Sequence, residues 1–334
     1  MNILLSCVGR RKYLIDYFKQ EVGPGNKIVG VDMSRTAPAL ASCDSWELVP
    51  SIYEEGYLDR ILDICLRNSI DALISLNDLE LPILGRGRHL FRDAGVELVV
   101  SSDSVIDICS DKYKTYLFCE DNLIPAPVSF VSLDRALAAI STGSVRYPLV
   151  VKPRWGSASF GLHIVNDEKE LVRAYGSCHA SLENSYLSRF AESVDDVIIQ
   201  EFISGKEYGL DIFNDVLGRY KGVVCKEKLA MRAGETDKAM TVDSGRFESL
   251  ATAIGRKLGH VGNMDCDFLE RDGRLYLLEL NPRFGGGYPF SHEAGANLVR
   301  ALLLSLAGRS NDIEISYEFD RVFAKCDSIV SFYD

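Results

Sequence analysis

Short apolar runs alternate with amphipathic stretches along the N-terminal third of the chain. The runs are rich in Val, Ile and Leu, as strands buried on both faces of a sheet usually are. They are Ile3–Val8, Lys27–Asp32, Ser45–Val49, Ala72–Leu76 and Glu97–Val100. Helical periodicity between them predicts helices over Arg11–Gln20, Gly56–Asn68 and Leu79–Ala94. This alternation predicts an α/β domain with a parallel, Rossmann-like sheet over residues 1–110.

The pattern changes after a break around residues 101–110. A helix is predicted over Asp111–Asp121, and later strand-like runs come in pairs, which predicts antiparallel hairpins. One pair is Tyr147–Val151 with Leu162–Val165, and another lies within residues 197–213. A strand followed by a loop with four cations is expected over residues 222–241. Further helices are predicted over residues 246–258 and 295–306, and a short strand after residue 310.

The richest chemistry follows an apolar strand near residue 280. Glu279, Asn281 and Arg283 stand at alternate positions, so an extended chain places them on one face. Carboxylate and amide oxygens suit a hard cation such as Mg²⁺, and a guanidinium suits a phosphate or carboxylate. Three glycines, residues 285–287, allow the backbone to approach a ligand. A polar turn after a strand is the ordinary alternative.

A second strand ends at Lys152 and is followed by a loop of small residues. Backbone N–H groups of such a loop can surround phosphate oxygens, to which a lysine adds charge. The candidate residues are Lys152, Gly156, Ser157, Ser159 and Gly161. An ordinary hairpin is the alternative, and a hairpin over a nucleotide is also a lid.

The paired strands within residues 197–213 offer a third candidate. The linker between them can present backbone groups to an adenine edge, and Glu207 can accept from ribose hydroxyls, although a plain hairpin fits too. The candidate residues are Gln200, Glu201, Phe202, Ile203 and Glu207.

Several cations and one acid are candidates for phosphate or substrate contacts. Lys226, Arg232 and Lys238 follow the ribose strand, and a solvated face is the alternative. Arg10 and Arg11 stand at a predicted helix N-terminus, where an anion binds favourably. Asp78 follows the fourth strand and is alternatively a helix N-cap.

Together these segments resemble the ATP-grasp superfamily, in particular its carboxylate–amine ligases and its carbamoyl-phosphate-synthase-like branch, over residues 1–310. The resemblance implies an ATP-grasp fold, with α+β subdomains over residues 111–193 and 194–334 behind the Rossmann-like domain. It implies that Lys112 and Lys152 hold phosphates, that Gly156 to Gly161 form a lid, and that Gln200 to Ile203 line adenine. It places Mg²⁺ (or Mn²⁺) on Asp267, Glu279 and Asn281, with Asp265 as the alternative to Asp267. Arg283 then lies by the transferred phosphoryl group or the acceptor carboxylate.

The function expected from this resemblance is ATP-dependent activation of a carboxylate as an acylphosphate, which an amine then attacks. The catalytic candidates are Arg283, Lys152 and Lys238. Alternatives are a carbamoyl-phosphate-forming subunit that uses bicarbonate and ammonia, a nucleotide-binding module without catalysis, and a hydroxyl kinase.

Composition narrows the partners. The chain has 334 residues, 47% hydrophobic content and a net charge of −11, which disfavours nucleic acid and anionic membranes as partners. Its nine cysteines show no C-x-x-C pattern, and no apolar run is long enough for a transmembrane helix. We expect reduced thiols, a cytoplasmic protein with small-molecule carboxylate and amine substrates, and a homodimer through an open sheet edge.

Overall fold

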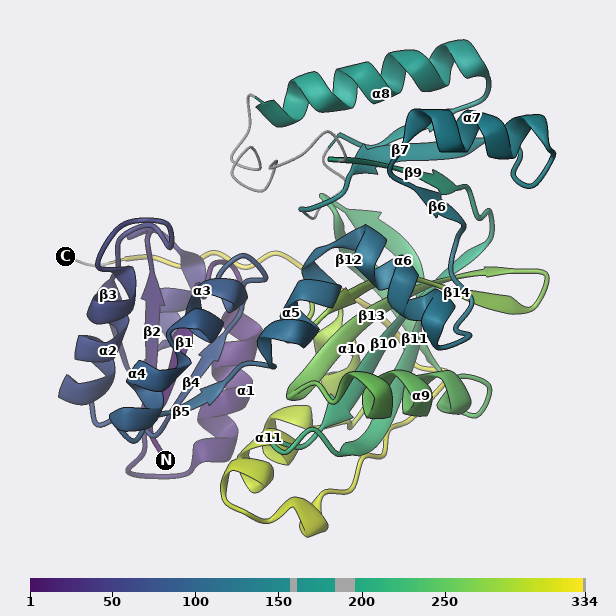
Figure 1. Cartoon of the computed structure of the whole chain (residues 1–334). Coiled ribbons are helices and arrows are strands. Elements are labelled where there is room, and N and C mark those ends of the chain that lie inside the picture. Colours follow the sequence, from purple (N-terminus) through teal and green to yellow (C-terminus); the bar gives the residue numbers. More distant parts are fainter. Residues whose placement is uncertain (157–160, 184–195, 333–334) are drawn as a thin grey trace.

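The computed structural model describes residues 1–156, 161–183 and 196–332, which form three sheets with helices packed on them (Figure 1). The parallel sheet comes first in the chain, and two antiparallel sheets follow. In the described residues, no helix is long and apolar enough to cross a membrane.

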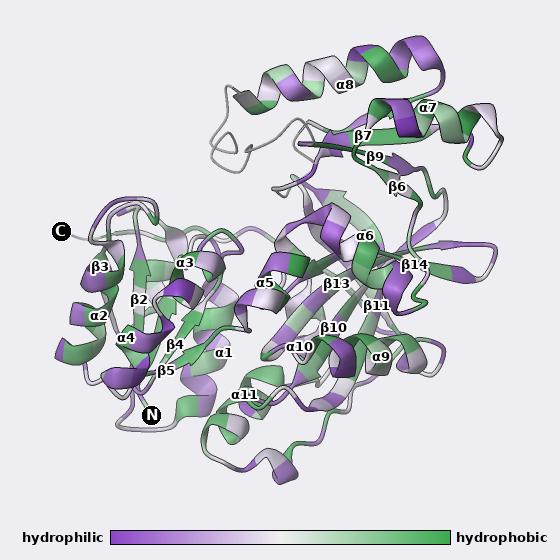
Figure 2. Cartoon of the chain, viewed as in Figure 1, coloured by the Kyte–Doolittle hydropathy of each residue, from purple (hydrophilic) through white to green (hydrophobic). Residues whose placement is uncertain are grey.

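The N-terminal sheet has five parallel strands in the order β3-β2-β1-β4-β5, as predicted. The strands are β1 (Ile3–Ser6), β2 (Ile28–Asp32), β3 (Ser45–Leu48), β4 (Ala72–Ser75) and β5 (Glu97–Val99). The helical segments are α1 (Lys12–Val22), a 3₁₀ turn (Pro38–Ser42), α2 (Tyr57–Arg67), α3 (Leu81–Arg86) and α4 (Arg88–Asp93). The strands are hydrophobic, and the helices carry mixed faces (Figure 2). The strand order reverses between β1 and β4, where open α/β sheets bind ligands beyond the strand ends.

Two sequence predictions in this region were wrong. The helix predicted over Leu79–Ala94 is split into α3 and α4 at Gly87, where a Cβ would lie 2.8 Å from Leu58 Cδ1. The break predicted over residues 101–110 is instead helix α5 (Asp103–Ser110), which buries Val105 and Ile106. Helix α6 (Lys112–Asp121) follows as predicted, capped by the Asp111 carboxylate.

A four-stranded antiparallel sheet has the order β6-β9-β7-β8. Its strands are β6 (Ser129–Phe130), β7 (Leu149–Pro153), β8 (His163–Val165) and β9 (Val197–Glu201). Helices α7 (Leu133–Ser141) and α8 (Glu168–Glu183) pack against it (Figure 1). The predicted pairing of β7 with β8 is confirmed. The hairpin predicted within residues 197–213 was wrong, because β9 pairs with β6 and β7 whereas residues 206–214 pair in another sheet. The chain therefore leaves the four-stranded sheet only after Glu201. The division of subdomains between residues 193 and 194 remains a prediction.

The largest sheet has six strands in the order β14-β13-β10-β11-β12-β15. They are β10 (Lys206–Asn214), β11 (Tyr220–Arg232), β12 (Glu235–Val242), β13 (Gly262–Arg271), β14 (Arg274–Asn281) and β15 (Val322–Ala324). The later helical segments are α9 (Glu248–Leu258), α10 (Tyr288–Glu293), α11 (Leu298–Leu306) and a 3₁₀ turn (Ser310–Asp312). One face buries Cys266 and Phe268 in a core that includes residues of α5, α6 and α9, and the alternate residues of β13 face the opposite side.

The cation-rich loop predicted within residues 222–241 is instead a hairpin of β11 and β12. Its turn is formed by Ala233 (φ 51°) and Gly234 (φ 79°), the left-handed geometry of a tight hairpin. The prediction was wrong because the polar residues of β11 and β12 resemble those of a loop, whereas backbone pairing forms the strands.

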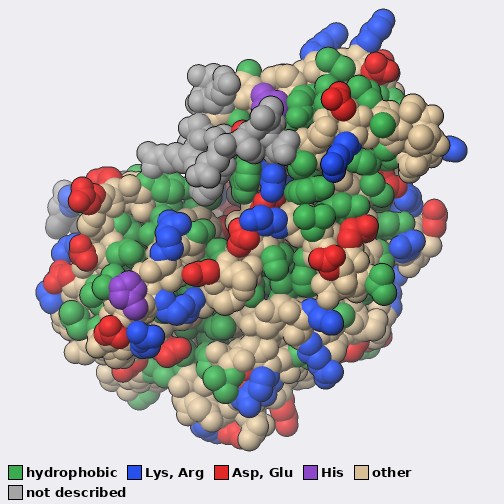
Figure 3. All heavy atoms as spheres, viewed as in Figure 1, with side chains coloured by type: hydrophobic (Ala, Val, Ile, Leu, Met, Phe, Trp, Pro, Cys, Tyr) green, Lys and Arg blue, Asp and Glu red, His purple; other side chains and the backbone are tan. Residues whose placement is uncertain are grey.

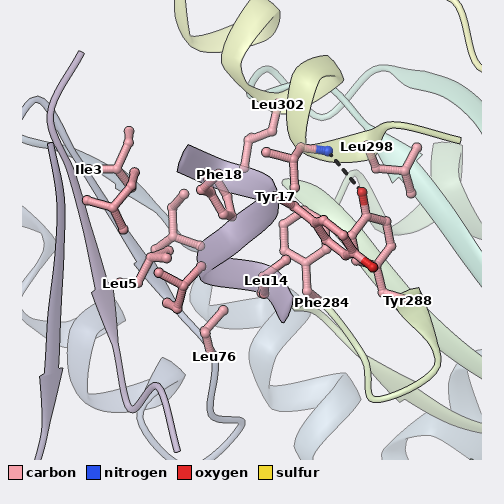
Figure 4. Packing of buried hydrophobic residues seen from close by; sticks show 14 of the residues in the cluster. Ile3, Leu5, Leu14, Tyr17, Phe18, Leu76, Phe284, Tyr288, Leu298 and Leu302 are labelled. Carbon is pink, nitrogen blue, oxygen red and sulfur yellow. Dashed lines mark hydrogen bonds between the residues drawn. The ribbon is translucent and has the colours of Figure 1, made fainter. Parts of the chain in front are cut away.

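Helix α1 joins the N-terminal sheet to the C-terminal half of the chain (Figure 4). Leu14 and Phe18 belong to one buried cluster with Ile3 on one side and Phe284 and Tyr288 on the other. The Tyr288 hydroxyl accepts a hydrogen bond from the Val299 amide at 3.2 Å. This packing holds the carboxyl end of β1 beside the glycine-rich loop that follows β14.

Candidate functional site

A cavity of about 580 Å³ lies between the carboxyl ends of the parallel strands and one face of the six-stranded sheet. The N-terminal wall comes from the loops after β1, β2, β3 and β4, and includes Arg11, Asp32 and Asp78. The opposite wall includes Asp267, Glu279 and other polar residues of β11, β13 and β14. The cavity therefore lies where the strand order of the parallel sheet predicts a ligand.

Strand pairing brings the candidate metal ligands together. Asp267 stands opposite Glu279, and Asp265 stands opposite Asn281, in the β13–β14 ladder. The pKa of Asp267 is raised to about 7, mainly by burial; Lys228 opposes this shift, and the nearby carboxylates of Asp265 and Glu279 add to it. The crowded acids therefore form an environment that favours an added cation.

Lys228, a residue that sequence reasoning missed, is held by two of the site's acids. Its Nζ lies 2.7 Å from Asp267 Oδ1 and 2.7 Å from Glu207 Oε1. Burial lowers the pKa of Lys228, but Asp267 and Glu207 outweigh burial and raise it. Strand periodicity would have identified Lys228, because it shares a face of β11 with Lys226.

The Arg283 guanidinium links both walls of the cavity. Its Nη2 and Nε donate to Asp78 Oδ2 at 2.6 and 3.0 Å, and its Nη1 donates to Asp265 Oδ2 at 3.1 Å. Burial opposes its charge, but Asp78 and Asp265 outweigh burial and raise the pKa of Arg283. A Cβ on Gly285 would lie 2.2 Å from the Asp265 carboxyl group, so glycine is required for this close approach.

The donor set fits Mg²⁺ bound together with a nucleotide. Among the described residues, no three His, Cys, Asp or Glu side chains form a ready-made metal cage. Mg²⁺ commonly takes one or two carboxylates and completes its shell with phosphate oxygens and water. Two carboxylates in register, with the Asn281 amide beside them, match that requirement.

Lys152 and Lys112 lie close enough to influence each other's charge. The pKa of Lys152 is lowered to about 8, mainly by burial and also by the charge of Lys112, while Glu279 opposes the shift. Lys112 Nζ donates to the Gly156 carbonyl at 2.5 Å, and Arg154 makes two hydrogen bonds of 2.7 Å to Asp111. The Gly156 end of the predicted lid loop is therefore hydrogen-bonded to α6. Gly161, at the other end of that loop, has φ 62°. Ser157 and Ser159 lie outside the described residues.

The predicted adenine residues lie at the end of β9 and do not line this cavity. Gln200 is buried and donates to Ser129 Oγ at 2.9 Å, and Glu201 pairs with Arg271 at 2.7 Å. Ile203 is buried and Phe202 half-buried. The proposed contacts of this segment with adenine remain predictions.

Of the remaining predicted cations, Lys226 and Arg11 line the cavity, and Arg232, Lys238 and Arg10 do not. Lys226 is buried, with its Nζ 2.5 Å from Asp211 and 3.1 Å from Ser291 Oγ, so its charge is already balanced. Arg232 pairs with Asp237 and Asp327 away from the cavity, and Lys238 is exposed on β12. Of the arginines near α1, Arg11 lines the cavity and Arg10 is exposed outside it.

Two polar atoms near the start of α1 have no hydrogen-bond partner among the described residues. They are Arg11 Nε and the Tyr13 hydroxyl, and both are buried. Burial raises the pKa of Tyr13 to about 12, while the charges of Arg11 and Arg283 oppose that shift. Sequence reasoning missed Tyr13, which could have been identified from its position in the first turn of a helix, two residues after Arg11.

A smaller cavity of about 80 Å³ adjoins the first. Both are lined by Asn77, Asp78, Leu79, Glu279 and Asn281. The small cavity adds a mainly apolar wall that includes Leu81, Ile106 and Trp155.

Acidic and basic side chains are interspersed with hydrophobic ones on the face of the molecule shown in Figure 3.

Comparison with known sequences identifies the family. A family described as PylC-like, N-terminal domain matches residues 3–99, and one described as ATP-grasp domain matches residues 109–287. The second match covers more than half of the 334 residues, so the chain belongs to the ATP-grasp family. Its homologues are ATP-dependent ligases of that family, which confirms the resemblance inferred from the motifs.

Three proteins show the range of enzymes to which this chain is similar. The arginine-specific large chain of carbamoyl phosphate synthase from Geobacillus stearothermophilus is 26% identical over 227 residues, which are 65% of this chain and 20% of that protein. The chain thus spans a fifth of that relative's length. The D-alanine–D-alanine ligase of Pediococcus pentosaceus is 30% identical over 146 residues, which are 40% of this chain and 38% of the ligase.

The third is the biotin carboxylase domain of Hydrogenobacter thermophilus 2-oxoglutarate carboxylase, solved as a dimer with MgADP, ADP and bicarbonate. It superposes with a TM-score of 0.75 at 18% identity, over 96% of this chain and 73% of that chain. This similarity confirms the predicted fold class, a parallel-sheet domain followed by antiparallel α+β units.

Proposed function

We propose that this protein is an ATP- and Mg²⁺-dependent ligase that activates a carboxylate as an acylphosphate and joins it to an amine. The observation that carries this proposal is the paired Asp267 and Glu279, with Arg283 beside them, facing the carboxyl ends of the parallel sheet across one cavity. Membership of the ATP-grasp family supports the same chemistry.

In this proposal the nucleotide lies between the two antiparallel sheets. Lys152 and Lys112 neutralise its phosphates, and their mutual repulsion in the free protein is relieved when the anion arrives. The segment from Gln200 to Ile203 receives adenine, and Glu207 receives ribose. Because Glu207 is 2.7 Å from Lys228, that lysine also connects the ribose position to the metal site.

Asp267, Glu279 and Asn281 hold Mg²⁺, with Asp265 as the alternative to Asp267. Asp265 is already paired with Arg283 at 3.1 Å, which favours Asp267 as the free ligand once Lys228 shifts. A bound magnesium ion supplies charge neutralisation to the phosphates during transfer. The protein's own contribution is to orient the donors and keep the site dry.

The acceptor carboxylate enters the large cavity and is placed by Arg283. Its oxygen attacks the terminal phosphorus of ATP, ADP leaves, and an amine then displaces phosphate from the acyl carbon. The partnerless Nε of Arg11, a residue that lines this cavity, offers a further donor to the acceptor's polar atoms. Arrangement of reactants in this way is the main source of catalysis in phosphoryl transfer.

ADP release over a panel of carboxylates crossed with amines tests this proposal. We expect Lys152→Ala and Glu279→Gln to lower turnover by about 100-fold or more, the scale for one preorganised electrostatic group. Exposed residues of the same charge on α8 provide the controls, Lys169→Ala and Glu168→Gln, with normal turnover expected. Near-normal turnover by the site variants would contradict the assignment.

A carbamoyl-phosphate-forming subunit is the second candidate, favoured by the similarity to carbamoyl phosphate synthase large chains. Bicarbonate would then replace the organic carboxylate, and ammonia would be the nucleophile. Carbamoyl phosphate formation from bicarbonate with ammonia or glutamine identifies this activity.

A cytoplasmic location and a homodimer are also part of the proposal. All nine cysteines are free thiols, six of them buried, which suits a reducing compartment. Strand β3 forms an edge of the parallel sheet and exposes Trp46 and Leu48, a surface suited to a second copy. Sedimentation equilibrium of the full chain tests the dimer.

A further inference from the structure

Asp78 has one carboxylate oxygen that no described residue satisfies. Both Arg283 nitrogens that reach Asp78, Nε and Nη2, donate to the same oxygen, Oδ2. The other oxygen, Oδ1, is buried and has no hydrogen-bond partner in residues 1–156, 161–183 and 196–332. A buried carboxylate oxygen without a donor is unfavourable, so Oδ1 is a place where a donor is missing.

Asp78 stands on the border between the two cavities, and their sizes differ greatly. The large one measures about 580 Å³ and the small one about 80 Å³. The latter has room for only a few non-hydrogen atoms, since a single water needs roughly 10–15 Å³ on the same scale. A carboxylate substrate of ordinary size therefore belongs in the large cavity, and the small one has room for a different, smaller reactant.

The side chains that line the small cavity indicate which kind of reactant it binds. Its wall is mostly apolar, with Leu79, Leu81, Pro82, Ile106 and Trp155, and its acids are Asp78 and Glu279. Of the cations around it, Arg283 is engaged by two carboxylates, and Lys112 donates to the carbonyl of Gly156 on the cavity wall. A cation that carries N–H donors satisfies Asp78 Oδ1. The Arg154 guanidinium already lies 4.9 Å from the centre of the Trp155 ring, so Asp78 and Glu279 are the lining groups that favour a cation here.

We propose that the small cavity binds the nucleophile of the ligase as an ammonium ion or a small primary ammonium, with Asp78 Oδ1 as its acceptor. This inference rests on the proposed ligase function and names the class of amine. It places the amine beside Asn281 and Glu279, at the edge of the large cavity where the acylphosphate forms.

The proposed formation of the C–N bond conserves protons and electron pairs. The bound R–NH₃⁺ gives one proton to the Asp78 carboxylate, and the nitrogen lone pair forms the C–N bond to the acyl carbon. The C–O bond to phosphate breaks, and its electron pair leaves on the phosphate. A second nitrogen proton passes to that phosphate, which leaves an amide with one N–H. Asp78 returns its proton to water when the product departs.

A binding experiment tests the cavity without any turnover. Trp46 and Trp155 are the two tryptophans, and Trp46 lies on β3 at the far edge of the parallel sheet, so Trp46→Phe leaves Trp155 as the reporter. We expect Trp155 fluorescence to change saturably with ammonium chloride and methylammonium chloride at constant ionic strength. Tetramethylammonium, which has no N–H and is larger, is expected to produce no saturable change.

The Asp78→Asn variant is expected to weaken ammonium binding about 10- to 100-fold, the usual effect of losing a charged hydrogen bond. Asp107→Asn, which removes an exposed carboxylate of α5, is the matched control and is expected to bind as the parent does. If Asp78→Asn fails to fold, Ser110→Phe fills the cavity from its exposed rim and is expected to abolish binding. Ammonium binding by Asp78→Asn, or by Ser110→Phe in its place, that equals binding by the parent would overturn the proposal.

Turnover separates this inference from the function on which it rests. With any active carboxylate, we expect ammonia and methylamine to be used, bulky amines to be rejected, and Asp78→Asn to raise the KM for the amine while the KM for ATP is unchanged. Efficient use of bulky amines would overturn the small-amine assignment and leave the ligase proposal intact. A protein that binds no MgATP analogue in calorimetry would instead contradict the proposed function itself.

Discussion

Lys228 Nζ lies 2.7 Å from Oδ1 of Asp267, a side chain that would hold the proposed magnesium ion. Both side chains are largely buried, with 7% and 18% of their surface exposed. The lysine therefore acts as the counter-ion of the site in the absence of metal. A divalent cation that arrives at Asp267 must compete with this ammonium.

Replacing Lys228 with methionine is expected to destabilise the metal-free protein by about 3 kcal/mol, because a buried carboxylate loses its partner. Asp267→Asn in the Lys228→Met background is expected to recover part of that loss. Urea unfolding of the four proteins of the cycle measures the coupling. Mg²⁺ is expected to raise the Tm of Lys228→Met more than that of the parent, and an equal shift would contradict the counter-ion role.

The fold was largely predictable because the N-terminal strands are short, apolar and separated by helices. The hairpin formed by β11 and β12 was missed because it contains two buried cations, Lys226 and Lys228. The unfavourable free energy of burying these charges is offset by ion pairs with acids on β10 and β13. Such partners are distant in sequence and are defined only by strand register. Helix α5 was missed for a similar reason, since its apolar residues face a core built from other elements.

Of the candidate site, the alternation of Glu279, Asn281 and Arg283 was sufficient to predict that they gather at one place. Local spacing did not predict that Asp78, from another domain, would hold Arg283 at 2.6 Å. It also did not separate Lys226, whose charge is neutralised by Asp211, from Lys228, which reaches the metal ligands. Periodicity predicts a shared face, whereas the pairing of charges across a sheet depends on tertiary structure.

Nucleotide binding is expected to take up protons near pH 8.5. The pKa of Lys152 is lowered from 10.5 to about 8 by burial and by Lys112, so a large share of the side chain is neutral at that pH. Phosphate oxygens favour the charged form and raise this pKa, so a proton is bound together with the nucleotide. Calorimetry in buffers of different ionisation enthalpy measures the uptake. Lys152→Met is expected to lose it, and undiminished uptake would place the effect elsewhere.

Lys152 also predicts how stability depends on pH. Because its folded pKa is lower than 10.5, the unfolded chain binds more protons between pH 8 and 10.5, and this group's contribution to stability rises with pH over that window. Below pH 8 the buried charge destabilises the free protein by about 3 kcal/mol, from the size of the shift. Lys152→Met is therefore expected to be more stable than the parent at pH 7 in chemical unfolding. A less stable variant would contradict the sign.

His260 predicts sensitivity to acid. The ring is fully buried, hydrogen-bonded to the Ile212 carbonyl at 3.0 Å, and burial lowers its pKa to about 4. Between pH 6.5 and 4 His260 binds a proton in the unfolded chain but stays neutral in the folded chain. Stability therefore falls as pH falls through that window. The loss is expected to reach about 3 kcal/mol near pH 4. His260→Gln is expected to remove this component of the slope, whereas exposed His89→Gln is expected to retain it.

Gly285→Ala is expected to lower turnover in the proposed reaction because of contact with one carboxylate. The new Cβ would lie 2.2 Å from Asp265, which in turn holds Arg283, so the loop or the acid must move. Turnover is expected to fall at least about 10-fold, since small displacements of positioning groups have effects of this size or larger. The control is Gly176→Ala on α8, where a Cβ meets no atom within 4 Å. That variant is expected to keep normal turnover and to gain about 0.5–1 kcal/mol of stability from helix propensity. Full activity of Gly285→Ala would show that the spacing between this loop and Asp265 is not required for catalysis.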